Sequence, residues 1–150
     1  MRSLGLDLGD RRTGVAISDP QGLLAIPLTV LSNKDEDATI VDIFKLAEQY
    51  HAERIVIGLP YSLDGNLGPQ ANKVKAFVEK LQNVIASEAK QSSLVGLDIQ
   101  LWDERLSTKA AEKLMLEAGA KRDKRKQHRD AIAAAFILQG FLDSLKGMSF

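Results

Sequence analysis

Three acidic residues, far apart along the chain, are of the type that binds divalent metal ions. Asp7 lies inside an apolar run near the N-terminus, Glu104 follows a later apolar run, and Asp130 begins an apolar pattern of helical period. Magnesium prefers hard oxygen ligands, usually a few carboxylates together with water and substrate phosphate. Two such ions about 3.5–4 Å apart can activate a water and stabilise the leaving oxygen of a phosphodiester. If the three acids converge, they favour metal-dependent hydrolysis of phosphodiester bonds.

Each acid also has an ordinary structural explanation. Asp7 equally suits an ion pair with Arg11 or Arg12 at a strand end, although a carboxylate among apolar neighbours is costly without a partner. The pair Asp103–Glu104 suits a solvated strand end, and Asp130 suits an acid that stabilises the first turn of a helix. Only the combination of the three acids favours a metal site. Glycines around Asp7 permit a tight turn and close backbone approach: Gly5, Gly9 and Gly14.

The elements that must position these acids alternate between strand and helix periods. The predicted strands are Leu4–Gly9, Thr13–Asp19, Pro27–Ser32, Arg54–Leu59 and Asp98–Asp103. The predicted helices are about Asp37–Tyr50, a segment that begins at Pro69, a short segment from Ser107 or Thr108 to about Gly119, and about His128–Leu145. Loops are expected at Pro60–Gly68 and Ala86–Gly96. This order predicts a single α/β domain over residues 1–150, with one mixed five-stranded sheet and helices on both faces.

Composition restricts the partners and the type of site. The net charge is zero, so attraction to nucleic acid requires a local basic patch. One such run is Lys121–Arg129, which contains six basic residues and one acid, although a charge run is more often a solvated loop. The absence of cysteine excludes disulfides and thiolate zinc sites, and two histidines make a histidine-rich site improbable. No run approaches the roughly 20 apolar residues of a membrane span, so a cytoplasmic protein is expected.

Four segments resemble the YqgF family, also called RuvX, in the order in which that family has them. Leu4–Asp19 reads LGLDLGDRRTGVAISD, and it is followed by Ile55–Pro60 with Gly65, by Asp103–Thr108 and by Asp130–Leu138. The family comprises bacterial RNase H-like proteins related to the Holliday-junction resolvases. The resemblance therefore implies an RNase H-like fold.

The resemblance assigns the catalytic and metal-binding roles to Asp7, Glu104 and Asp130. The resolvase relatives carry an acid at the end of their fourth strand, where this chain has Gly58–Pro60. Glu104 is taken as the substitute for that acid, with Asp103 as the alternative. We expect Asp7 to bridge two Mg²⁺ or Mn²⁺ ions, while Glu104 and Asp130 each complete one coordination shell.

The family resemblance implies a nuclease that matures the 5′ end of precursor 16S ribosomal RNA. Cleavage of branched DNA, the activity of the resolvases, is the alternative, and the sequence leaves the oligomeric state open. Residues expected to bind the phosphate backbone are Arg105, Lys124, Arg125 and Lys126. For Arg105 an ion pair with Asp103 is equally plausible. Trp102 is expected to pack in the core rather than to stack on a base.

Two other classes of protein share parts of this pattern. An aspartate and a glycine turn on the first strand also occur in sugar kinases and actin-like ATPases, but those proteins close two such domains around a nucleotide and this chain supplies one. A non-catalytic assembly module that retains the acids is the second rival. The presence of all three acids favours the enzyme.

Overall fold

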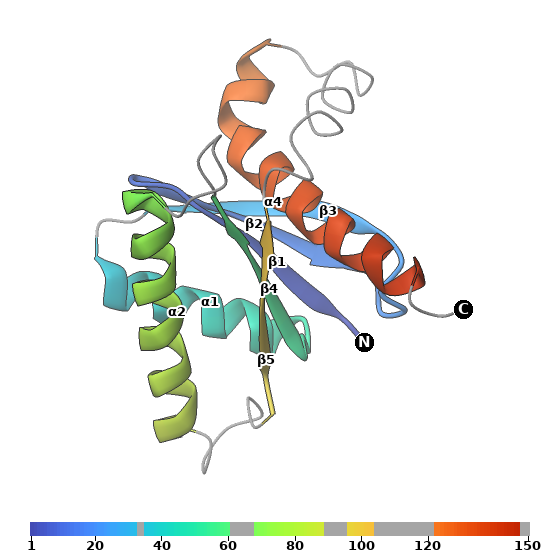
Figure 1. Ribbon diagram of the computed structural model, residues 1–150. Helices are drawn as coiled ribbons and strands as arrows, with labels where there is room; N and C mark the ends of the chain where they lie inside the picture. Colours follow the sequence, from blue (N-terminus) through green and yellow to red (C-terminus); the bar gives the residue numbers. More distant parts are fainter. Residues whose placement is uncertain (33–34, 61–67, 89–95, 104–121, 148–150) are drawn as a thin grey trace.

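The computed structural model of the 150-residue chain describes residues 1–32, 35–60, 68–88, 96–103 and 122–147, with the backbone alone for residues 88, 122–128 and 147. The five strands are β1 (Ser3–Leu8), β2 (Arg12–Ser18), β3 (Ala25–Ser32), β4 (Arg54–Leu59) and β5 (Asp98–Asp103). The helices are α1 (Glu36–Gln49), α2 (Pro69–Glu88) and α4 (Arg122–Gly147) (Figure 1). The short helix predicted to end near Gly119 lies outside the described residues.

The strands form one mixed sheet in the order β3-β2-β1-β4-β5. An antiparallel meander joins β1, β2 and β3, while β4 and β5 run parallel to β1. The central strands are apolar because they are covered on both faces, and Ile55–Leu59 of β4 is buried throughout. The prediction of a mixed five-stranded sheet is confirmed.

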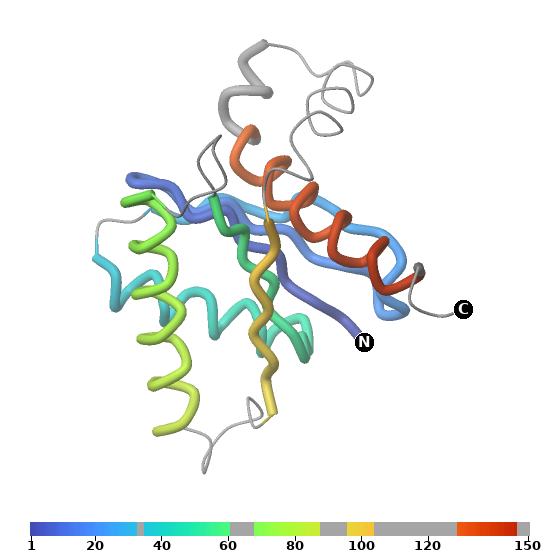
Figure 2. Tube along the Cα trace, viewed as in Figure 1, coloured from blue at the N-terminus to red at the C-terminus, as the bar shows by residue number. Residues whose placement is uncertain are grey.

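The helices cover opposite faces of this sheet. One face carries Leu4, Leu6, Val15 and Ile57, which pack with apolar residues of α1 and α2. The other face carries Ala16 and Val56, which pack with α4. Figures 1 and 2 show α4 on the side of the sheet opposite to α1 and α2. Within the described parts of the chain, no helix has both the length and the apolar character needed to cross a membrane.

The packing layers on the two faces of the sheet follow from the alternating direction of side chains along each strand. Successive strand residues point to opposite faces, so Leu4, Leu6 and Leu8 face α1 and α2 while Gly5 and Asp7 face α4. Full burial of a leucine or isoleucine side chain contributes about 1.5–3 kcal/mol. Most of the large, fully buried side chains belong to the α1–α2 layer, which makes it the main core.

Several element boundaries differ from those predicted. Helix α1 begins at Glu36 because the Asp35 side chain accepts a hydrogen bond from the Asp37 amide and caps it. Helix α2 continues to Glu88, so the first residues of the predicted loop Ala86–Gly96 are helical. Helix α4 begins at Arg122 instead of about His128. Lysine, arginine and glutamine are good helix formers, and the basic run contains no glycine or proline.

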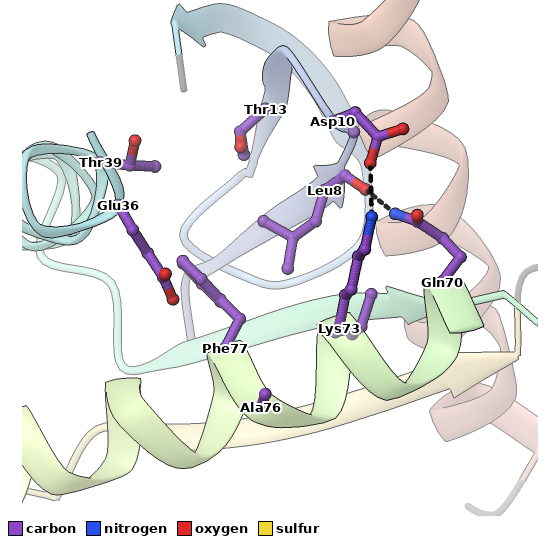
Figure 3. Close-up of a pocket in the computed structure, with 11 residues that line it drawn as sticks. Leu8, Asp10, Thr13, Glu36, Thr39, Gln70, Lys73, Ala76 and Phe77 are labelled. Atoms are coloured by element: carbon purple, nitrogen blue, oxygen red, sulfur yellow. Dashed lines mark hydrogen bonds and ion pairs between the residues drawn. The ribbon is translucent and has the colours of Figure 1, made fainter. Parts of the chain in front are cut away.

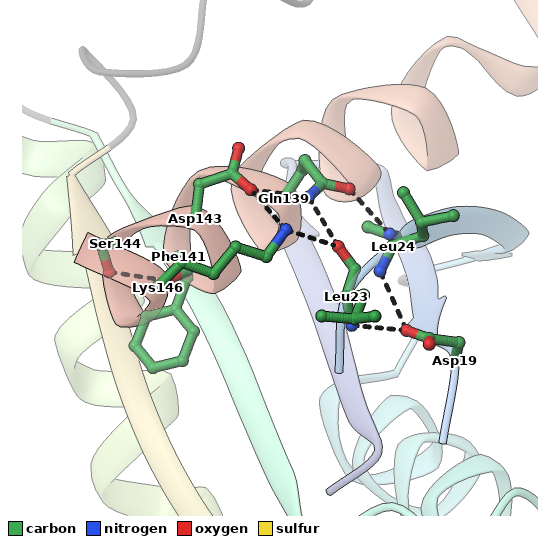
Figure 4. Close-up of polar contacts among 9 residues, drawn as sticks. Asp19, Leu23, Leu24, Gln139, Phe141, Asp143, Ser144 and Lys146 are labelled. Atoms are coloured by element: carbon green, nitrogen blue, oxygen red, sulfur yellow. Dashed lines mark hydrogen bonds and ion pairs between the residues drawn. The ribbon is translucent and has the colours of Figure 1, made fainter. Parts of the chain in front are cut away.

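Polar contacts fix the C-terminal half of α4 to the β2–β3 turn (Figure 4). The Gln139 side-chain carbonyl accepts a hydrogen bond from Ala25 N at 2.9 Å, and its amide donates to Leu23 O at 3.0 Å. Asp19 Oδ1 accepts hydrogen bonds from the Leu23 and Leu24 amides. The loop is therefore held from within by Asp19 and from α4 by Gln139.

Candidate active site

Asp7 is the next-to-last residue of β1, at the carboxyl end of the strand. It is half-buried and lies opposite Gly14 of β2 in the antiparallel register. Residues directly opposite each other in such a pair project from the same face of the sheet. The sequence predicted Asp7 in the middle of the strand Leu4–Gly9, whereas β1 ends at Leu8 and places Asp7 one residue from its carboxyl end.

Asp130 lies on α4 directly above the strand position opposite Asp7. A Cβ atom added to Gly14 would overlap the carbonyl group of Asp130 and approach Ala131 N to 2.9 Å. The Gly14 Cβ position therefore points at α4, and Asp7, its strand partner, projects from that same face. Antiparallel partners have Cα atoms about 4.5–5.5 Å apart, so the fold brings the backbone of Asp130 close to that of Asp7.

The early start of α4 removes the ordinary explanation of Asp130. The helix dipole favours an acid only within the first turn. Asp130 lies more than two turns inside a helix that begins at Arg122. The prediction that Asp130 opens the last helix is therefore wrong, and stabilisation of a helix N-terminus does not account for this half-buried acid.

The third acid is not among the described residues. Glu104 and Arg105 lie outside them, so their placement stays a prediction. The described part of the chain contains no group of three histidine, aspartate or glutamate residues suited to hold a metal ion. The position nearest Asp7 on β4 and facing α4 is Gly58, which pairs with Trp102 of β5 and supplies no carboxylate.

Asp103, the alternative to Glu104, occupies a strand position that faces away from Asp7. It pairs with Leu59, whose side chain belongs to the core under α1 and α2. Trp102, its neighbour, packs in the cluster under α4 and meets Phe141 edge to face, with ring centroids 6.1 Å apart. As expected, Trp102 packs against the core, although it is only partly buried. The alternation of β5 argues against Asp103 as a partner of Asp7.

The predicted phosphate-binding residues Lys124, Arg125 and Lys126 belong to the first turns of α4. They share one continuous helix with Asp130, rather than a loop that precedes it. Lys126 lies four residues before Asp130, which is about one turn of helix. Arg129 is exposed beside Asp130.

A separate cavity of about 390 Å³ opens beyond the end of β1, on the α1–α2 side of the sheet (Figure 3). Lys73 Nζ lies 3.6 Å from the Asp10 carboxylate, and the Gln70 amide donates to Leu8 O at 3.4 Å. Both members of the Lys73–Asp10 pair are exposed, so it contributes little to stability. The cavity and Asp7 are on opposite faces of the sheet.

The sequence predicted one of the two residues that shape the α4 face only in part and gave no role to the other. Gly14 was noted as permitting close approach, but its partner was unknown. Gln139 passed unnoticed, although a glutamine next to Leu138 in the apolar pattern of the last helix is a signal that a buried or half-buried amide needs partners.

The sequence matches a known family over almost its whole length. Residues 1–144 match the family RuvX, described as Holliday junction resolvase. A protein of Clostridium botulinum named "Putative pre-16S rRNA nuclease" is 44% identical over 145 residues, which is 97% of this chain and 98% of that protein. A protein of the same name from Clostridium kluyveri is 45% identical over the same shares of both chains.

Two solved structures with a similar fold are resolvases. Thermus thermophilus RuvC in complex with a Holliday junction substrate has a TM-score of 0.64 at 16% identity and covers 98% of this chain and 96% of its own. The fowlpox virus Holliday junction resolvase has a TM-score of 0.55 at 13% identity, covering 96% and 99%. At these identities the likeness establishes the RNase H-like fold alone. The match over residues 1–144 and the 44–45% identity to full-length relatives show that this chain belongs to the RuvX (YqgF) family.

Proposed function

We propose that this chain is a metal-dependent nuclease that hydrolyses phosphodiester bonds with Asp7, Glu104 and Asp130 as its catalytic carboxylates. The observation that carries the proposal is the contact between Gly14 and Asp130. It places an interior acid of α4 over the strand position opposite Asp7, although the two acids come from opposite ends of the chain. Neither a strand-end ion pair nor a helix-dipole effect requires that arrangement.

The residues present fit a hard divalent cation. Asp7 and Asp130 are both half-buried, so each residue is partly exposed to solvent while its backbone belongs to a packed strand or helix. Carboxylate oxygens are the ligands that Mg²⁺ and Mn²⁺ prefer. When bound, a pair of such ions would supply an activated water and charge neutralisation at the scissile phosphate.

The protein itself positions the carboxylates that would hold the ions and supplies the positive charges that would bind the phosphate backbone. Asp7 lies on β1 and Asp130 on α4, so regular hydrogen-bonded backbone positions both carboxylates. Glu104 is preferred over Asp103 as the third ligand because Asp103 occupies a position that faces α1 and α2. Lys124, Arg125, Lys126 and Arg105 are proposed to bind the phosphate backbone, which makes binding dependent on salt concentration.

The proposed substrate is precursor 16S ribosomal RNA, cleaved in the maturation of its 5′ end in the cytoplasm. The relatives that carry this name are 44–45% identical over nearly the whole chain. RuvC, which binds a Holliday junction, is only 16% identical. The RuvX family is nevertheless described as a resolvase, so branched DNA is the second candidate substrate.

The test offers purified protein two substrates, an RNA with the 5′ extension of 16S rRNA and a four-way DNA junction, with Mg²⁺ or EDTA. We expect Mg²⁺-dependent cleavage of the RNA, lost in Asp7→Asn and retained in Asp143→Asn. The latter removes the same charge from an exposed position at the far end of α4. Cleavage of the junction alone would favour the resolvase. Metal-dependent binding without cleavage of either substrate would favour an assembly module.

A further inference from the structure

Gly14 lies where β1, β2 and α4 meet. Its backbone pairs with Asp7 on one side. The space that a side chain would occupy is filled by the carbonyl group of Asp130 and, at 2.9 Å, by Ala131 N. Backbone atoms within a helix cannot turn aside as the end of a flexible side chain can. Any side chain at position 14 would therefore have to push this turn of α4 away from the sheet.

Gly5 makes a second close contact with α4, one turn farther along the helix. A Cβ on Gly5 would come within 2.7 Å of the Leu138 Cβ and 2.8 Å of the Ala134 carbonyl oxygen. Ala134 follows Asp130 by four residues, or about 6 Å along the helix axis. The two glycines thus allow α4 to contact the sheet closely at two points. Only the contact at Gly14 involves a predicted metal ligand, Asp130.

The far end of α4 is held independently. Gln139 hydrogen-bonds the backbone of Leu23 and Ala25, and Phe141 packs against Trp102 and the Arg54 guanidinium. A helix fixed there and pushed outward at Gly14 would tilt, and the displacement would be largest toward its N-terminal end. Asp130 would move away from the sheet, while Asp7 would stay on β1.

We propose that Gly14 is a positioning residue of the metal site: its lack of a side chain sets the depth at which Asp130 sits relative to Asp7. This inference rests on the proposed function, because it takes Asp7 and Asp130 to share the metal. Gly14 touches neither metal nor substrate in this role. It acts through the backbone of Asp130.

The test measures Mn²⁺ binding to the metal-free protein by titration calorimetry, with no nucleic acid present. Changes to residues that orient metal ligands typically cost about 10–100-fold in metal affinity, and we expect Gly14→Ala to fall in that range. Gly5→Ala is the matched control, because it places the same methyl group under the same helix away from Asp130. It should destabilise the protein but lower Mn²⁺ affinity by less than about 10-fold, the lower end of that range.

Rescue by a longer ligand separates positioning from general damage. A glutamate reaches farther than an aspartate by one methylene group. Asp130→Glu should weaken Mn²⁺ binding in the native sequence but strengthen it in the Gly14→Ala background. Equal weakening by Gly14→Ala and Gly5→Ala, or no rescue by Asp130→Glu, would overturn the proposal.

Two further measurements keep the test decisive. Trp102 fluorescence reports whether α4 still packs on the sheet, and if Gly14→Ala fails to fold, Ala131→Val replaces it. Ala131 is buried and its backbone N lies at the Gly14 contact, so a larger side chain at position 131 should also displace this turn of α4, with the same loss of Mn²⁺ affinity and the same rescue. Asp7→Asn distinguishes the two proposals. If it leaves Mn²⁺ affinity unchanged, the metal site itself is wrong. If it weakens binding while Gly14→Ala and Ala131→Val do not, only the positioning role fails.

Discussion

Replacing Asp7 with asparagine separates a metal ligand from a structural acid. Without metal, the carboxylates of Asp7 and Asp130 repel each other if they gather as proposed. Two unit charges about 4 Å apart interact by about 1 kcal/mol in water and about 4 kcal/mol at an effective dielectric constant of 20. Both acids are half-buried, so the repulsion should fall between these limits. Asparagine removes one charge and nearly keeps the shape, so the metal-free variant should be as stable as the native protein or more stable.

With magnesium bound, the native protein should be more stable than Asp7→Asn. Magnesium binds only the folded site, so a hundredfold excess over its dissociation constant stabilises the native protein by about 2.7 kcal/mol. For a chain of this length each kcal/mol raises the melting temperature by about 2–4 °C. The native protein should therefore gain about 5–11 °C, and Asp7→Asn should gain clearly less.

The assay is thermal unfolding of both proteins with EDTA and with saturating Mg²⁺. Asp143→Asn serves as the matched control, since Asp143 is an exposed acid of α4 that pairs with Lys146 at 3.4 Å. It should keep the full magnesium shift. A metal-free Asp7→Asn clearly less stable than the native protein, with an unchanged magnesium shift, would refute the metal site and make Asp7 a structural residue.

Three further predictions concern the helix and the loop that surround the site. Lys126→Ala should weaken RNA binding and lower the slope of log affinity against log salt by about one, and an unchanged slope would show that Lys126 does not contact the phosphate backbone. Backbone hydrogen bonds from Leu24 and then Leu23 lower the pKa of Asp19. Its stabilising contribution is therefore present above the unfolded pKa and is lost as the pH falls below about 4, so the stability difference from Asp19→Asn, measured by urea unfolding, should shrink in acid. Gln139→Leu removes the partner of Ala25 N and one of the two partners of Leu23 O, and should cost about 1–3 kcal/mol in unfolding free energy; a neutral result would show that water replaces the amide.

Local pattern determined most of the fold. The apolar run of β4 predicted its bounds correctly, and the helical period after Ser32 predicted α1 to within a residue at each end. These signals suffice because burial on one face or on both imposes a period on the sequence itself. The start of α4 was mispredicted because a run of Lys and Arg has no apolar period, yet the same residues have high helix propensity.

The candidate site was only partly determined in this way. The motifs around Asp7 and Asp130 and the resemblance to RuvX singled out both acids from the sequence. The alternation of side chains along a strand also requires Gly5 and Asp7 to share one face of β1. Which helix covers that face, and at what depth, depends on residues distant in sequence.

Only the tertiary structure decided that Asp130 sits over the strand position opposite Asp7. That arrangement has two causes. Gly14 and Gly5 have no Cβ, which lets the backbone of α4 approach the sheet. Gln139 holds the far end of the helix. A glycine in the sequence allows close approach without naming its partner. The partner is chosen by the packing of the whole layer, because interiors are close-packed and a helix can settle only where the opposing surface leaves room for it.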